Sequence, residues 1–391
     1  MTLLEVLFAI MVAAVGLLGA IAVFPVALSQ ARKGLIADVT AVAGESAIAT
    51  FQAEGMNQRA RWIAWPNNTQ AFVPPNFQSS SNTTYFGYAF CIDPMLFSHS
   101  ADDDPGNAAV WSFFPAVPSA AAPNTRMRRL TLHNGNFNLP NDPAASMSIV
   151  QADKVFRIED ALLYERPSDN TLPAAQLFTT INDNGTLRPA RRQEEGRLTW
   201  FATLVPKIDR LQLADGNGIA RLGEEYVLSV VVCHNRPNGE GLHVNDDPAN
   251  PEHPWNEWTA KILATDFHSD GIGGGEVTIT TNDQGIGAPF NKEEYLNLRS
   301  GQWIMLGRTL PGGNNQARPI QHFQWYRVSD TDETISLANG RWSQDVSLIG
   351  PDWPADVQAP AGTNEECDVI IMPTVVHVYE RTIKIETGAL Q

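Results

Sequence analysis

Cysteine is scarce in this chain. Cys91, Cys233 and Cys367 are the three cysteines among 391 residues, which excludes a scaffold built on many disulfides. One disulfide would leave one thiol over, and the spacing does not indicate which pair would form it. Cys233 ends the apolar run Tyr226–Cys233, so we expect a buried core thiol there rather than a nucleophile.

Basic residues are also in short supply. The chain has 27 Lys and Arg against 43 Asp and Glu, a formal net charge of -16. Binding to nucleic acid needs clustered basic side chains, so we expect no nucleic-acid partner. The acidic balance fits a well-solvated surface, or one that collects divalent cations. Hydrophobic residues make up 43% of the chain, enough for a packed core.

Motifs of common enzyme classes are missing as well. The sequence has no GxSxG elbow, no HExxH zinc helix and no P-loop, and we predict that the protein is not an enzyme. The segment from Asp266 to Gly271 begins like a calcium loop, but Val277 stands where the bidentate Glu is needed. The acidic stretch 243–253 is interrupted by prolines and reads as a surface loop. No residue is therefore assigned to a metal.

The N-terminus carries a long run without charge. From Val6 to Leu28 no residue is ionisable, and about 20 apolar residues suffice to span a bilayer as a helix. A secretory signal peptide would begin with basic residues, and none precedes this run. Spaced apolar residues continue to Phe51, and Gly55 is the first plausible stop. A helix over 2–54 would be roughly 80 Å long at about 1.5 Å per residue.

Glu5 is the one ionisable side chain in the first 31 residues. A carboxylate deep in a bilayer costs about 2.5–3.5 kcal/mol and normally has a partner. The amino group of Met1, in the same copy or in a neighbouring one, could neutralise it; alternatively Glu5 lies in the headgroup region. Further along, Pro25 removes a helical hydrogen bond, Gly16 and Gly19 weaken the preceding turns, and small residues let helices approach closely.

The segment Met1–Leu7, followed by an apolar helix, resembles the mature N-terminus of type IV pilins and type II secretion pseudopilins. The resemblance implies that a prepilin peptidase removes a basic leader, that the new N-terminus at Met1 is methylated, and that Glu5 guides assembly. Phe is usual at the first residue of that family, where this chain has Met1. We interpret the chain as the processed form. Its final segments, 341–354 and 375–386, resemble those of large pilin-like proteins of planctomycete-type bacteria.

The remaining sequence predicts a large head rich in β-strands. Residues 62–145 are crowded with turn formers and aromatics, and 153–165 fit either a helix or a strand. Strand patterns are present at 198–205, 226–233, 276–281, 302–310, 322–328, 341–348 and 375–386. We expect an α+β fold: a long N-terminal helix followed by a mainly antiparallel β head. The expected domains are a helix at 1–54, a loop-rich lobe at 55–196 and a β-rich head at 197–391.

The resemblance implies a structural filament subunit. The chain would be inserted in the inner membrane, polymerise with itself through residues 1–54 and reach the cell surface with the help of the assembly machinery. One alternative is a periplasmic pseudopilin of a type II secretion system. Another is a membrane-anchored carbohydrate-binding or hydrolytic domain, because the chain has 10 Trp. The resemblance also implies calcium as a candidate cofactor, since some pseudopilins use it. Asn67, Asn82 and Asn184 match the N-glycosylation pattern.

Overall fold

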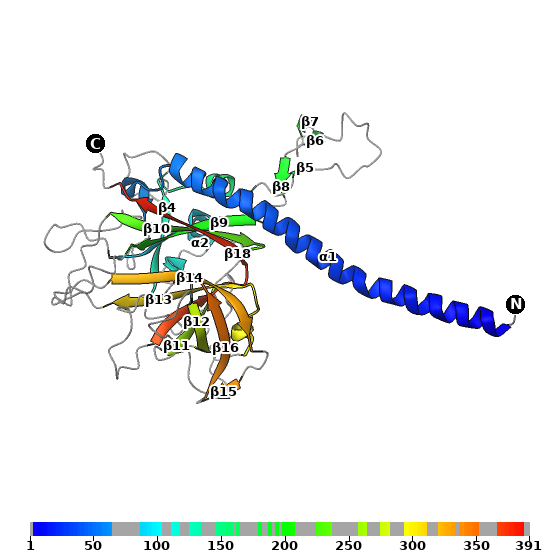
Figure 1. Ribbon diagram of the computed structural model, residues 1–391. Coiled ribbons are helices and arrows are strands. Elements are labelled where there is room, and N and C mark those ends of the chain that lie inside the picture. Colours follow the sequence, from blue (N-terminus) through cyan, green and yellow to red (C-terminus); the bar gives the residue numbers. More distant parts are fainter. Residues whose placement is uncertain are drawn as a thin grey trace.

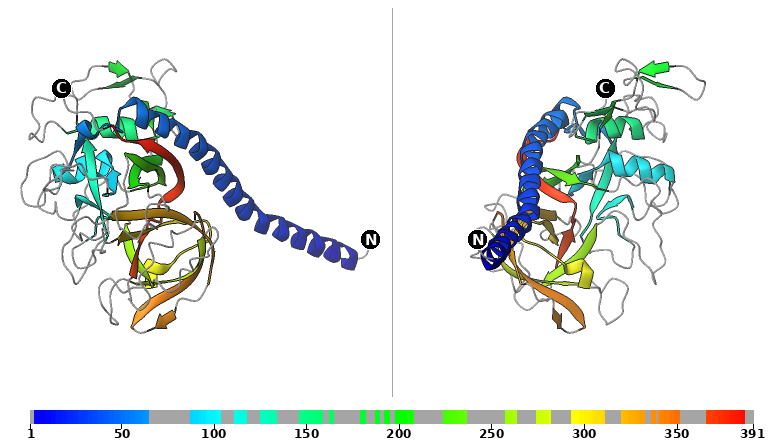
Figure 2. Two further views of the ribbon diagram at one scale, coloured as in Figure 1. Left: turned by 60° about the vertical axis from the view of Figure 1, so that its left-hand side comes forward. Right: turned by 90° about the vertical axis from the view of Figure 1, so that its right-hand side faces the viewer.

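The computed structural model describes most of the chain in segments and places them in three layers (Figures 1 and 2). The described residues are 3–64, 87–103, 111–117, 125–133, 146–158, 162–164, 179–181, 187–189, 192–194, 198–207, 224–236, 257–263, 274–281, 293–310, 320–332, 336–338, 340–351 and 366–386. Helices cover one face of a sheet, and a β-barrel covers the other face.

Helix α1 runs from Leu3 to Ala53. Its first half projects away from the body, and its second half lies across β10 and β18 (Figure 1). The helix ends just before Gly55, whose φ of 60° is the left-handed conformation that glycine adopts without strain. The amides of Gly55 and Met56 donate to the carbonyls of Gln52 and Phe51, as in a common helix C-terminus.

The first sheet has seven strands, ordered β1-β4-β2-β9-β10-β18, with β3 paired to β4. All described pairs in this sheet are antiparallel except β2 with β4, which is parallel. The bounds are β1 Trp62–Ile63, β2 Phe90–Ile92, β3 Phe113–Phe114, β4 Met127–Leu132, β9 Leu198–Pro206, β10 Glu225–His234 and β18 Val375–Lys384. The sheet therefore takes strands from both sides of the boundary expected at 196/197.

The second sheet closes on itself. Its order is β12-β11-β17-β13-β14-β16-β15, and an added pairing of β12 with β16 joins six strands into an antiparallel barrel. Closure leaves those six strands without a free edge. The bounds are β11 Trp258–Leu263, β12 Gly274–Thr281, β13 Trp303–Leu310, β14 Ile320–Thr331, β15 Ser336–Ala338, β16 Arg341–Ile349 and β17 Glu366–Ile371.

Short elements complete the described chain. Ser148 and Gln151 form a capping box at the start of α4, with both reciprocal bonds present. The other helices and the two small hairpins are η1 Arg59–Arg61, α2 Pro94–Asp103, α4 Ile149–Phe156, η6 Glu293–Leu296, β5 Leu162–Tyr164 paired with β8 Arg192–Glu194, and β6 Thr179–Ile181 paired with β7 Leu187–Pro189. Residues 153–165 thus contribute the end of a helix and then a strand.

Apolar residues on both faces of the strands build this layered body. In β13, Ile304 and Leu306 belong to the core inside the barrel, whereas Met305 belongs to the core between barrel and sheet. In β10, Val230 faces the helices and Val231 faces the barrel. Double-sided burial explains why these strands have apolar residues at consecutive positions instead of a clean alternation.

The predicted α+β class is wrong. Strands dominate the described residues, and they include a closed six-stranded barrel that the prediction of an open antiparallel head did not contain. Apart from α1, the described helices are at most 10 residues long. The physical reason is that the barrel depends on the pairing of β12 with β16, some 70 residues apart in sequence, which local patterns do not reveal.

Candidate functional site

The first half of α1 carries most of the exposed large apolar side chains among the described residues. Nine large apolar side chains between Leu3 and Phe24 are 46–79% exposed. These side chains are Leu3, Val6, Leu7, Phe8, Ile10, Met11, Val12, Leu17 and Phe24. Successive helical residues are rotated by about 100°, so they point in several directions around the axis. A large exposed apolar surface of this kind marks an interaction site.

The second half of α1 sits closely on the first sheet through small residues. Ala43, Ala47 and Phe51 are buried, at the four-residue spacing of one helix face. A Cβ on Gly44 would lie 2.2 Å from ring carbons of Tyr379, so only glycine permits this contact. The Tyr379 hydroxyl donates to the carbonyl oxygen of Thr40 at 2.9 Å. Glycine and small residues therefore set how α1 leaves the body.

Val42 departs from the expected apolar pattern of this half. The sequence groups Val42 with Val39 and Phe51 as recurring apolar positions, but Val42 is 73% exposed. It lies on the side of α1 that faces a groove beside the helix.

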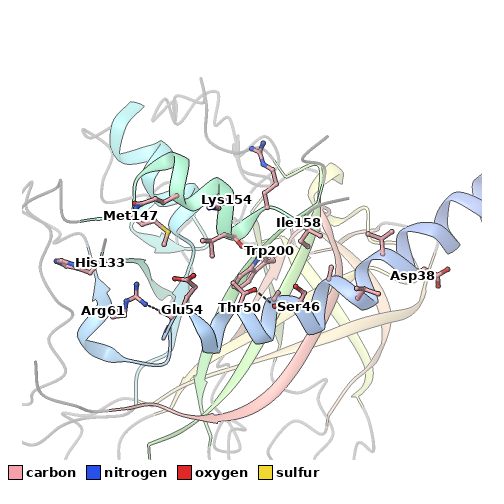
Figure 3. A pocket seen from close by; sticks show the side chains of 17 residues that line it. Asp38, Ser46, Thr50, Glu54, Arg61, His133, Met147, Lys154, Ile158 and Trp200 are labelled. Carbon is pink, nitrogen blue, oxygen red and sulfur yellow. Dashed lines mark hydrogen bonds between the residues drawn. The ribbon is translucent and has the colours of Figure 1, made fainter. Parts of the chain in front are cut away.

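This groove lies between α1 and α4, and the first sheet forms its floor (Figure 3). Its volume is about 930 Å³. Trp200 of β9 forms part of the floor, donates from Nε1 to the carbonyl of Val155 at 3.0 Å, and packs against Phe156 with ring centroids 4.4 Å apart. Lys154 and Arg157 line the α4 side, and Arg157 pairs with Asp153 at 3.3 Å. The groove thus combines a partly apolar lining with charged groups along its walls.

The predicted assembly residues occupy α1. Glu5, Gly16, Gly19 and Pro25 lie within the helix, and nothing approaches within 4 Å of a Cβ built on Gly16. Met1 lies outside the described residues. The structure therefore places four of the five along one element.

The structure describes the three cysteines, but not the predicted glycosylation triplets or the acidic segments. Cys91, Cys233 and Cys367 are all free and buried, and burial raises the pKa of each thiol, that of Cys233 to about 12. The three glycosylation triplets and the acidic segments 243–253 and 266–271 lie outside the described residues. Within the described part, no group of three His, Cys, Asp or Glu side chains is placed to hold a metal ion.

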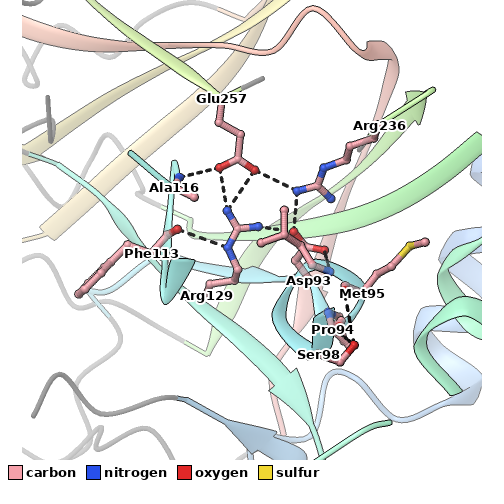
Figure 4. Close-up of polar contacts among 10 residues, drawn as sticks. Asp93, Pro94, Met95, Ser98, Phe113, Ala116, Arg129, Arg236 and Glu257 are labelled. Carbon is pink, nitrogen blue, oxygen red and sulfur yellow. Dashed lines mark hydrogen bonds and ion pairs between the residues drawn. The ribbon is translucent and has the colours of Figure 1, made fainter. Parts of the chain in front are cut away.

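Four buried charged residues form a cluster that the sequence analysis missed (Figure 4). Arg129 of β4 donates to Asp93 and, at 2.8 Å, to Glu257. Arg236, just after β10, donates to Asp93 at 2.7 Å and to Glu257 at 2.9 Å. Glu257 also accepts from the amide of Ala116 at 2.6 Å. Because Glu257 immediately precedes β11, the cluster ties the barrel to the first sheet.

Partners within the cluster favour the charged forms of Asp93, Arg129 and Arg236. Burial alone would raise the pKa of Asp93, but Arg236 and Arg129 lower it below its ordinary value. Burial would likewise lower the pKa of Arg236 and Arg129, but Asp93 and Glu257 raise both. Two carboxylates and two guanidinium groups leave no net charge. Asp93 also caps α2, accepting from the amide of Leu96 at 3.3 Å, so Asp93-Pro94 begins a helix.

Tryptophan serves mainly the core in the described residues. Trp62, Trp111, Trp200 and Trp325 are at most 2% exposed, so these four do not form an open aromatic platform of the kind that binds sugars.

Comparisons with known proteins add no family. No protein-family model matches this chain, and a search of curated proteins finds no match. In the described part of the chain, no helix is both long and apolar enough to cross a membrane.

Proposed function

We propose that this protein is a subunit of a type IV pilus-like filament that polymerises through the first half of α1. Before assembly, the charge-free run Val6–Leu28 holds the subunit in the inner membrane; during assembly, the same surface is buried among neighbouring helices. The observation that carries the proposal is the exposed apolar surface of α1, together with the N-terminal sequence that resembles mature pilins.

Energetics support this use of the helix. Burying one large apolar side chain is worth about 1.5–3 kcal/mol, so covering the nine exposed ones contributes on the order of 10 kcal/mol per copy. Association costs about 4–15 kcal/mol in lost freedom of motion. The first half of α1 can therefore offset most or all of that cost when several neighbours cover it.

A matched pair of variants tests the proposal. Full-length protein is purified in detergent, the detergent is removed, and polymers are measured by sedimentation and electron microscopy. Met11→Lys places a charge on the first half of α1, and Val150→Lys places one on α4; the two residues are 65% and 71% exposed. Burying an unpaired Lys costs well over 1.4 kcal/mol.

The expected result is that Met11→Lys raises the critical concentration by about tenfold or more, while Val150→Lys leaves it unchanged. If unmodified protein forms no polymer, or if both variants polymerise normally, the proposed function is wrong.

A further inference from the structure

We propose that the groove between α1 and α4 receives the first half of α1 from a second copy of this chain. The inference rests on the proposed function and adds a specific contact to it. It states which surface of the head covers the exposed helix, and it predicts a measurable offset between neighbouring copies.

The shape of the groove fits a helix lying along it. Along α1 the groove is lined from Asp38 to Glu54, a length of about 24 Å at about 1.5 Å per residue. The groove therefore runs alongside about four to five turns of α1, and it is open on one side, so a helix can lie along it.

The chemistry of the groove fits an uncharged occupant. Its apolar lining includes Val39, Val42, Ala47, Ile158 and Trp200. Polar and charged residues, among them Asp38, Glu54 and Lys154, also line the groove. A lining that mixes apolar and polar side chains is common in protein interfaces.

The first half of α1 has the required length and character. The run from Val6 to Leu28 carries no charge and exceeds the extent of α1 from Asp38 to Glu54 that lines the groove. A helix lying along the open groove keeps its other side free, which suits a segment whose described apolar side chains point in several directions. Further copies can cover that second side.

One copy's helix cannot fill its own groove. Ile10 and Val42 lie in one continuous helix, and 32 residues at about 1.5 Å each separate them by about 48 Å. The contact must therefore join two copies through different surfaces. Such a heterologous contact generates a filament wherever the rotation between copies does not close a ring.

The same repetition fixes the register. With α1 aligned along the proposed filament axis, identical steps keep all helices nearly parallel, so the occupant's N-terminal end lies near Asp38. The part of the occupant that fills the groove must lie within its uncharged run, residues 6–28, so that no charge enters the groove. This condition places residues 10–16 of the occupant level with Val42 of the receiving copy. The offset between neighbours along α1 is therefore 26–32 residues, about 39–48 Å.

Cysteine cross-linking tests this register in assembled full-length protein. Val42→Cys is combined in turn with a cysteine at each position from Ile10 to Gly16, so that all sides of the helix and the whole predicted level are sampled. Matched controls combine Val42→Cys with Leu3→Cys or Phe24→Cys, which are as exposed as the described test positions but lie outside the predicted level. The native cysteines are buried. Oxidation with copper(II) phenanthroline forms a disulfide where Cα atoms approach within about 7 Å.

The expected result is a ladder of covalent multimers for one or two of the seven test pairs, with a yield on the order of tenfold above both controls. A ladder beyond the dimer is diagnostic, because each copy then donates a helix and receives one. Replacing Val42→Cys by Val150→Cys should abolish the ladder.

Two failures can be told apart. Normal polymers in which no test pair exceeds the controls would overturn the groove contact and leave the proposed function standing. Absence of polymers from the unmodified protein would overturn both.

Discussion

The buried charge cluster gives the sharpest test of how the barrel is held to the first sheet. Glu257→Gln keeps the size of the side chain and removes one of two carboxylates from a cluster whose members are at most 7% exposed. Arg129 and Arg236 would then share Asp93 alone and leave one uncompensated buried charge. Breaking a buried ion pair in this way costs about 3–5 kcal/mol. That loss is a large fraction of a typical stability of about 5–15 kcal/mol.

A surface pair supplies the control. Lys207 and Glu225 pair at 3.0 Å with side chains 47% and 59% exposed, and exposed pairs contribute about 0–1 kcal/mol. Urea unfolding is followed by circular dichroism for Glu257→Gln and Glu225→Gln. With an m-value of about 3 kcal/mol per molar, we expect the first midpoint to fall by about 1 M or more and the second by less than about 0.3 M.

A double variant separates charge balance from loss of contacts. Arg129→Met with Glu257→Gln removes one charge of each sign and leaves Asp93 paired with Arg236. Its loss of stability should be smaller than the sum of the two single losses, because each single variant strands a charge and the double variant does not. Equal midpoints for Glu257→Gln and Glu225→Gln, or strict additivity in the double variant, would refute the reasoning.

Three further outcomes follow from other parts of the molecule. Gly44→Ala should lower the thermal midpoint, since overpacking against Tyr379 costs about 1–3 kcal/mol. Gly34→Ala on the same helix meets nothing within 4 Å and should raise the thermal midpoint. A rise for both variants would contradict the close packing of α1 on Tyr379. Burial lowers the pKa of His322 to about 4, so protonation favours unfolding. The neutral buried side chain contributes about 3 kcal/mol to the free energy of unfolding above pH 6.5, and this contribution is lost as the pH falls toward 4. His322→Gln should flatten the pH dependence of the urea midpoint, and an unchanged slope would exclude that role. Glu5→Ala should leave the protein membrane-inserted but absent from filaments in fractionated cells; a normal filament yield would contradict an assembly role for its charge.

Strand positions could be predicted from the sequence because local patterns define them. The seven predicted strands correspond to β9, β10, β12, β13, β14, β16 and β18, with bounds that differ by a few residues. The strands at β11 and β17 were missed. Trp258–Leu263 contains Lys261, and Glu366–Ile371 contains Asp368, which interrupt the apolar pattern. Their pairing with each other and with the barrel is non-local, so no window of sequence contains it.

Some features of the candidate site can also be predicted from the sequence, and others depend on the fold. The uncharged run of α1 can be read directly from the sequence, and so can the stop at Gly55. The groove cannot, because its walls come from α1 and α4 and its floor includes Trp200. The buried cluster is equally hidden: Arg129 follows Arg128 in a strand of mixed character, and only the fold brings Asp93 and Glu257 to it. The capping box Ser148-x-x-Gln151 was a local signal for α4 that could have been found.

The order of the layers places the barrel on the side of the first sheet that the proposed filament contact does not use. Of the proposed assembly surfaces, the groove lies on the helical side of the first sheet, and the first half of α1 projects away from the body. The barrel packs on the opposite face through Met305, Phe323 and Trp325, and Trp325 donates from Nε1 to the hydroxyl of Thr203 at 3.3 Å. Side chains fill the inside of the barrel and closure removes its edges. The barrel therefore presents no unpaired edge among those six strands that could add copies by strand pairing. In the proposed filament, growth is left to the helix, and the barrel can vary without altering the proposed repeating contact.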